Sequence, residues 1–395
     1  MLKNSQIKLS VISAVLGAVL IMTGFIYAVR KPLWNDELYS QVGGIQAKSY
    51  VQILVGEIDE GNNSPLFYLV QKFITQVVSF RFPLDWKGEV FVEDHRSQII
   101  LRIGSNLFMT MAAVSLFYFF ARYVSLAFGL YAFLLFLSSY TVWVYWSEAR
   151  PYALWILLTT WQSLLFVRLC FYGKNSARVF NGLMGVHVLL ALTTVMSTIS
   201  IAAFSLLTWL IKEKEWKKFI PLTFIPLAIC SFYFLRAPKY LWRVPQSLYQ
   251  LLYPCFSEDQ WIIWGAYFLA LAVFFIGRWA KMPWSSDLKI EKKGVWELLG
   301  MTLMIFAVSV IYQIFRARQP QGMAGFEIVT RYFIFLVPVG IIATVLVAVD
   351  LLNATVNHRW LKVNIIIGLA GLLILRFLKS DPIWMWFEYF TSHVR

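Results

Sequence analysis

The chain has 395 residues, of which 59% are hydrophobic and 14% are charged, whereas soluble domains carry about a quarter charged residues. With a mean hydropathy of +0.65, this composition indicates a polytopic membrane protein and excludes an ordinary soluble domain. The formal net charge of +14 does not indicate a nucleic-acid partner, because basic residues flank membrane spans in a positive-inside topology. The three cysteines, Cys170, Cys230 and Cys255, lack CxxC spacing and indicate neither a disulfide framework nor a zinc site.

Apolar runs long enough to form membrane helices recur along the chain. The first exceeds the ~7–15-residue core of a cleaved signal peptide, so we expect it to remain as an anchor. The run from 180 to 211 is too long for one span at ~1.5 Å per residue, and we divide it at a polar patch near 193–198. Eleven candidate helices result, at about 9–29, 99–120, 124–145, 152–171, 180–194, 198–211, 219–235, 261–276, 295–315, 332–349 and 363–378.

The positions of the basic residues predict the orientation of these helices. A cytoplasmic N-terminus places the clusters at 168–178, 212–218, 278–293 and 359–362 inside, as the positive-inside rule requires. The first outer loop, residues 30–98, is long enough to cross the membrane regardless of its charge. We therefore expect an all-α, multi-pass protein of the plasma (inner) membrane. Residues 1–395 are expected to form one integral-membrane domain without a soluble C-terminal domain.

The first outer loop contains an amphipathic segment. Its apolar residues recur at helical spacing, at Leu66, Leu69, Val70, Phe73, Ile74, Val77 and Val78. The other face carries Gln71, Lys72, Thr75, Gln76 and Ser79. This pattern predicts a helix that lies in the membrane interface. The preceding Asn62-Asn63-Ser64-Pro65 predicts a capped start with Pro in the first turn.

Polar segments that could carry chemistry all lie on the outer face in this topology. They are Asn35–Tyr39, Asn63–Tyr68, Trp146–Leu154 and Phe326–Tyr332, with Leu101–Ser105 at the top of the second span as a fifth. Two adjacent carboxylates, Asp36 and Glu37, follow the first span by a few residues. Their convergence with outer-face arginines would bring a base close to a site for an anionic ligand.

Each of these residues also has a plain structural interpretation. Taken alone, Asp36 and Glu37 are read more readily as solvated loop carboxylates than as a site. Glu148 and Arg150 are consistent with an ion pair that closes a helix turn, before a helix that starts at Pro151. Arg102 and Arg331 are consistent with side chains that extend to the lipid headgroups. The residues alone leave both interpretations open.

The ordered set of motifs resembles a known family. An acidic pair after the first span, Asn63-Ser64-Pro65-Leu66-Phe67-Tyr68, "LRIGS" at 101–105, "SEARPYAL" at 147–154 and "RYFIFLVP" at 331–338 are similar to those of the C-type (GT-C) integral-membrane glycosyltransferases. The narrower resemblance is to the bacterial mannosyltransferase-like branch, which is related to protein O-mannosyltransferases and the lipid A aminoarabinose transferase. Where relatives commonly have a His before the Pro-containing segment, this chain has Asn62-Asn63-Ser64.

The resemblance implies transfer of a sugar, with inversion, from a polyprenyl-phosphate carrier to a hydroxyl group of a glycan, lipid or protein acceptor. It implies Asp36 as the general base and Glu37 as its catalytic neighbour. Arginines suit the developing phosphate charge, and the candidates are Arg331, Arg102 and Arg150. The supporting residues implied are Glu148, Tyr152, Asn63 and Tyr332.

Several alternatives stay open at the level of sequence. A divalent metal near the acidic pair is one, since hard cations take oxygen ligands, but two carboxylates do not require it. A lipid-linked glycan polymerase or ligase is a second, although such an enzyme would be expected to use large late outer loops. A lipid or polysaccharide transporter is a third, which broken helices and buried charges would favour. Besides the donor and acceptor, only membrane lipids are expected as partners, and no nucleic acid.

Overall fold

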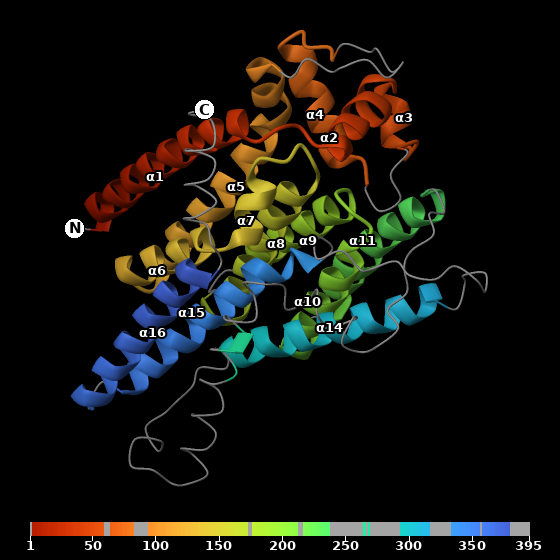
Figure 1. Ribbon diagram of the computed structural model, residues 1–395. Coiled ribbons are helices and arrows are strands. Elements are labelled where there is room, and N and C mark those ends of the chain that lie inside the picture. Colours follow the sequence, from red (N-terminus) through yellow and green to blue (C-terminus); the bar gives the residue numbers. More distant parts are fainter. Residues whose placement is uncertain are drawn as a thin grey trace.

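A computed structural model of the chain shows a bundle of helices (Figure 1). It describes residues 2–58, 64–82, 94–172, 176–211, 216–237, 264–265, 268, 293–316, 333–355 and 358–379. The helices are α1 (Leu2–Arg30), α2 (Asn35–Tyr39), the π-helical η1 (Ser40–Gln46), α3 (Tyr50–Leu54), α4 (Leu66–Val77), α5 (His95–Tyr123), α6 (Leu126–Leu137), α7 (Tyr140–Trp146), α8 (Tyr152–Val167), the π-helical η2 (Arg168–Tyr172), α9 (Ser176–Ala191), α10 (Ser197–Ile211), α11 (Trp216–Arg236), α14 (Lys293–Arg316), α15 (Leu336–Ala354) and α16 (Arg359–Lys379). The predicted all-α fold class is confirmed for this part of the chain.

Six of these helices are long and apolar enough to cross a membrane, which makes this a multi-pass membrane protein. They are α1, α5, α8 with η2, α14, α15 and α16. The pair α6 and α7 is bent by 70° and would count as a seventh span. Three further predicted runs form shorter apolar helices, at Ala177–Ala191, Ser197–Ile211 and Ile220–Arg236. The predicted run at 261–276 lies almost wholly outside the described residues.

The division of the run from 180 to 211 is confirmed. Helix α9 ends at Ala191 and α10 begins at Ser197. The first loop docks onto this break, where the N–H of Ser64 donates to Thr193 O at 3.2 Å and that of Leu66 donates to Leu192 O at 2.7 Å. The break therefore also holds the start of α4.

Helix α4 confirms the helix predicted near 66–78, but two details differ. Pro65 is its N-cap and makes no side-chain capping bond, so the predicted polar cap is replaced by the backbone bonds to the α9–α10 break. Gln71 and Thr75 face the protein interior, whereas Phe73 and Val77 are 61% and 66% exposed. The apolar face of α4 thus points away from the protein, as it must if it lies against lipid.

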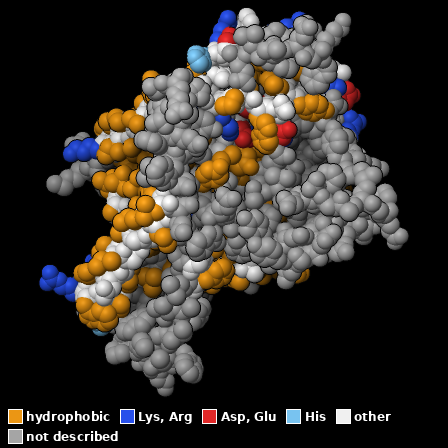
Figure 2. All heavy atoms as spheres, viewed as in Figure 1, with side chains coloured by type: hydrophobic (Ala, Val, Ile, Leu, Met, Phe, Trp, Pro, Cys, Tyr) orange, Lys and Arg blue, Asp and Glu red, His pale blue; other side chains and the backbone are white. Residues whose placement is uncertain are grey.

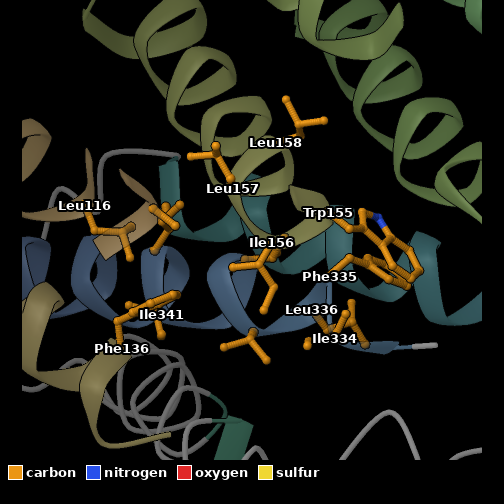
Figure 3. Close-up of a cluster of buried hydrophobic side chains, with 14 of the residues drawn as sticks. Leu116, Phe136, Trp155, Ile156, Leu157, Leu158, Ile334, Phe335, Leu336 and Ile341 are labelled. Carbon is orange, nitrogen blue, oxygen red and sulfur yellow. The ribbon is translucent and has the colours of Figure 1, made fainter. Parts of the chain in front are cut away.

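The core is built mainly from α5, α6, α8 and α15. Trp155 of α8 stacks on Phe335, which precedes α15, with ring centroids 5.2 Å apart. Figure 3 shows these rings beside Ile156 and Leu336 from the same two segments. Helix α8 is buried along most of its length, because other helices surround it.

The bundle has two distinct ends. Helices α2, α3 and α4 lie together at one end (Figure 1), which we call the loop end. The end of α11 reaches it, since Tyr233 Oη donates to Leu54 O at 2.8 Å and Arg236 donates to Val55 O at 2.9 Å. At the opposite end Lys293 Nζ lies 4.0 Å from the ring centroid of Tyr172. The predicted topology requires helices that alternate in direction between these two ends.

Candidate functional site

The acidic pair lies at the loop end, and one of its members is fully buried. Both oxygens of Glu37 contact the guanidinium of Arg102, with Nε to Oε1 at 3.0 Å and Nη2 to Oε2 at 2.6 Å. Both side chains are 0% exposed. Two charges taken out of water together require good geometry and further hydrogen bonds, and this bidentate pair has both.

Backbone N–H groups complete the surroundings of Glu37. Oε2 accepts from Trp34 N at 2.9 Å, as the third residue of a helix does in a capping box. Oε1 accepts from Ala149 N at 2.7 Å. Burial by itself would raise the pKa of Glu37, but the hydrogen bond and charge of Arg102 and these two N–H groups hold the pKa below its usual value. Glu37 therefore ties α2 to residues 148–150 as a carboxylate.

Arg102 uses all of its guanidinium donors within the protein. Besides Glu37, it donates to the carbonyl oxygens of Ala28, Lys31 and Pro32. A guanidinium has five N–H donors, and these contacts account for five. The carbonyls at the end of α1 lack helical partners, and a cation is favoured there. The geometry therefore favours a structural role for Arg102 over the expected contact with a phosphate.

Asp36 differs from Glu37 in its exposure. Its side chain is 37% exposed and lies 3.6 Å from Arg150 Nη2. Arg150 is held in turn, because its Nη1 donates to Ser40 Oγ at 2.8 Å and its guanidinium lies 5.7 Å from the ring centroid of Tyr152. Tyr152 itself is buried. The predicted base and one predicted phosphate ligand are thus neighbours, with the carboxylate accessible.

Glu148 is paired with Lys31 instead of Arg150, so the ion pair proposed between Glu148 and Arg150 is wrong. Lys31 Nζ lies 3.0 Å from Glu148 Oε1 and donates to Val144 O at 2.8 Å. Glu148 Oε2 is buried and has no hydrogen-bond partner within the described part of the chain. Burial raises the pKa of Glu148, and the charge of Lys31 opposes this rise.

The segment 147–150 is held over α5 by polar contacts. Ser105 Oγ donates to Glu148 O. One residue further along α5, Asn106 Oδ1 accepts from Trp146 Nε1 at 2.9 Å, and its amide donates to Ile21 O at 2.9 Å. Gly24 permits this contact, since a Cβ there would lie 2.0 Å from Asn106 Oδ1. The 70° bend between α6 and α7 thus brings residues 147–150 onto the ends of α1 and α5.

Three of the expected site residues, Asn63, Arg331 and Tyr332, lie outside the described residues. Two residues that the motifs did not single out belong to the site, namely Lys31 and Ser40. The position of Lys31 directly after an apolar span was a usable signal. Nothing in the local sequence marks Ser40, because its contact with Arg150 is made across 110 residues of chain.

The described residues contain no group of three or more His, Cys, Asp or Glu side chains placed to hold a metal ion. The two adjacent carboxylates also fit such an ion poorly, since Glu37 already accepts from Arg102, Trp34 and Ala149. In Figure 2, basic and acidic side chains lie close together among hydrophobic ones, near the place of α2 in Figure 1. The charged groups of the site are paired with one another.

Fold and site together define a polytopic helical membrane protein with a network of paired charges at its loop end. No family model matches the sequence, and no curated protein matches it.

Proposed function

We propose that the protein is an inverting glycosyltransferase of the plasma membrane. It moves a sugar from a polyprenyl-phosphate carrier to an acceptor hydroxyl group of a glycan, lipid or protein on the extracytoplasmic face. The observation that carries the proposal is the exposed carboxylate of Asp36 beside Arg150, on a segment fixed by the buried pair of Glu37 and Arg102. A membrane protein with an accessible base and a neighbouring guanidinium has the two groups that such a transfer requires.

The chemistry follows from the acceptor and the leaving group. An alcohol is a poor nucleophile, so a base takes its proton as the new bond to the anomeric carbon forms. Asp36 has that role. The bond from the anomeric carbon to the phosphate oxygen breaks, and its electron pair stays on the phosphate. Attack opposite to the leaving group inverts the anomeric centre.

Arg150 serves this step in two ways. It lies 3.6 Å from Asp36, so it can hold the carboxylate of the base in position. It also presents a guanidinium where negative charge develops on the phosphate. Arg331 is proposed as a second phosphate ligand, with Asn63 and Tyr332 in support. Glu37 and Arg102 act as positioning residues because both are fully buried.

The wider layout supports membership of the GT-C class with eleven spans. Contacts at the loop end join Lys31, directly after α1, to the segment after α7, and they join the first loop to that same segment and to the end of α11. The contact between Lys293 and Tyr172 lies at the opposite end. This alternation is the one that the eleven-span topology, with an extracytoplasmic loop end, requires.

The test is transfer from a polyprenyl-phosphate sugar by purified protein in lipid. Asp36→Asn keeps the size of the side chain and removes the base, and we expect transfer to fall by about 10²–10⁴-fold. Glu57→Gln is the matched control, since Glu57 is an exposed carboxylate of the same loop, and its activity should stay at the wild-type level. If folded Asp36→Asn protein transferred sugar at the wild-type rate, Asp36 would not be the general base.

A second candidate, a lipid or polysaccharide transporter, is favoured by two observations. The span formed by α6 and α7 is broken by a 70° bend. Glu297 of α14 is 0% exposed, and neither of its carboxyl oxygens has a partner within the described ranges. Broken helices and intramembrane carboxyls are common in transporters. If the protein moved a lipid-linked sugar across the membrane of proteoliposomes without covalent transfer, it would be a transporter and not the proposed enzyme.

A further inference from the structure

Lys31 lies at the end of α1 and contacts the site through Glu148. Its ammonium donates to Glu148 Oε1 at 3.0 Å and to Val144 O at 2.8 Å. An ammonium has three donors, and the third has no acceptor among the described residues. The Lys31 side chain is 15% exposed, whereas that of Glu148 is 3% exposed. The accessible member of this buried pair is therefore the cation.

The two arginines of the site are less available to an anion. All five donors of Arg102 are used by Glu37 and by carbonyl oxygens. Arg150 is 8% exposed, and it contacts both Ser40 and Asp36. Lys31 combines a spare donor with some exposure, and among these three cations it is the one best able to accept a new anionic ligand.

The position of Lys31 along α1 also matches the place where a lipid phosphate lies. Only 11% of the apolar window of α1 is buried, and Val15, Val19 and Met22 are 56%, 57% and 62% exposed. Figure 2 shows hydrophobic side chains along this helix. A helix so exposed faces lipid, and its end lies at the level of the headgroups. A carrier lipid that moves along α1 therefore brings its phosphate to Lys31.

We propose that the ammonium of Lys31 binds the phosphate of the lipid-linked donor, while Glu148 and Val144 O hold that ammonium in place. This inference rests on the proposed function and adds a donor ligand to it. The segment 148–150 then lies between two subsites. Lys31 binds the phosphate from the Glu148 side of this segment, and Arg150 contacts it from the other side, where Asp36 receives the acceptor proton.

Binding of polyprenyl monophosphate, the donor without its sugar, tests this role in protein reconstituted in nanodiscs. We expect Lys31→Met to weaken binding by about tenfold or more, because a hydrogen bond between charged groups is lost. Lys31→Arg should restore most of the affinity. In transfer assays, Lys31→Met should raise the KM for the donor more than it lowers kcat.

Lys72→Met is the matched control. Lys72 is a lysine of the same loop that also donates to two carbonyl oxygens, of Ile45 and Lys48. Its loss should leave the affinity for polyprenyl phosphate unchanged. An equal loss of affinity in Lys72→Met and Lys31→Met would overturn the proposal, since the effect would then reflect general charge or stability.

Glu148→Gln provides a second test that does not depend on the folding of Lys31→Met. It keeps a side-chain oxygen that can accept from the ammonium and removes the negative charge that competes with phosphate, so we expect tighter binding of polyprenyl phosphate. Weaker or unchanged binding would count against Lys31. If wild type and Lys31→Met bind polyprenyl phosphate equally well, and transfer still depends on Asp36, then Lys31 is not a phosphate ligand but the proposed enzyme reaction stands. If binding of polyprenyl phosphate depends on Lys31 but no sugar is transferred, then the proposed enzyme reaction is refuted and the phosphate site stands.

Inorganic phosphate is the second probe and identifies the source of the ligand. Binding that depends on Lys31 for polyprenyl phosphate but not for inorganic phosphate indicates a lipid headgroup site. Binding that depends on Lys31 for both probes indicates a site for phosphate in general. Either result supports Lys31 as a phosphate ligand.

Discussion

Asp36 and Glu37 are neighbours in the chain but lie in opposite environments. Glu37 is fully buried and accepts four hydrogen bonds from Arg102 and two backbone N–H groups. Asp36 is 37% exposed and lies 3.6 Å from Arg150. The buried carboxylate thus fixes the position of the segment, whereas the exposed one, a single residue away, is the one that we propose for proton transfer. The comparison teaches that adjacent acids need not share a role.

The largest expected effect is the loss of the buried pair. Arg102→Met leaves the charge of Glu37 in the interior without its cationic partner, and breaking a buried ion pair in this way costs about 3–5 kcal/mol. We expect a large fall in the thermal unfolding midpoint of the detergent-purified protein. Arg122→Met is the control, because Arg122 is an exposed arginine of the same helix. Equal midpoints for the two variants would contradict a structural role for the pair.

The double variant Glu37→Leu/Arg102→Met sharpens this result. Because it removes both charges, it should regain much of the lost stability. It should not regain transfer activity, since α2 is then no longer tied to residue 149. Recovery of both stability and activity would show that the pair does not position Asp36.

A smaller effect is expected where α1 and α5 meet under the site. Gly24→Ala places a Cβ against Asn106 Oδ1, and such overpacking costs about 1–3 kcal/mol. Gly17→Ala is the control on the same helix, because its Cβ would lie 3.7 Å from the nearest atom, in Val114. The unfolding midpoint should fall for Gly24→Ala only. A fall in both would mean that helix packing in general is responsible.

Changes around the exposed carboxylate, Asp36, and its neighbour Arg150 should alter activity with little change in stability. Ser40→Ala removes the nearer of two acceptors of Arg150 Nη1, so we expect transfer to fall about fivefold to tenfold, as for the loss of ~1 kcal/mol. The measurement is kcat and KM of the reconstituted enzyme. Ser13→Ala, which removes a hydroxyl bonded within α1, should have wild-type kinetics.

The smallest effect concerns pH. The pKa of Glu37 is lowered in the folded state, so its stabilising contribution is present above the unfolded pKa and is lost as the pH falls through the lowered value. The pKa of Glu148 is raised, so stability falls as the pH rises through that value. Unfolding midpoints measured against pH should lose this second decline in Glu148→Gln. Persistence of the decline would assign it to another group.

The sequence by itself determined the class of protein and most helix positions. Apolar runs predicted α5, α8, α14, α15 and α16 within about five residues at each end, and they predicted the end of α1 but placed its start seven residues late. The runs are informative because burial of backbone groups in lipid permits only helices of sufficient length. The division between α9 and α10 followed from a polar patch in a run too long for one span. The amphipathic helix α4 followed from its periodicity.

The tertiary structure decided the pairing of charges. Adjacent motif residues suggested that Glu148 would pair with Arg150 and that Arg102 would bind a phosphate. The ends of α1, α5 and α7 instead bring Lys31 to Glu148 and Arg102 to Glu37. Partners separated by 65 to 117 residues leave no local pattern, because only the packing of helices sets their distance. Whether a carboxylate is buried or exposed is therefore a property of the fold, and that property separates the role of Asp36 from the role of Glu37.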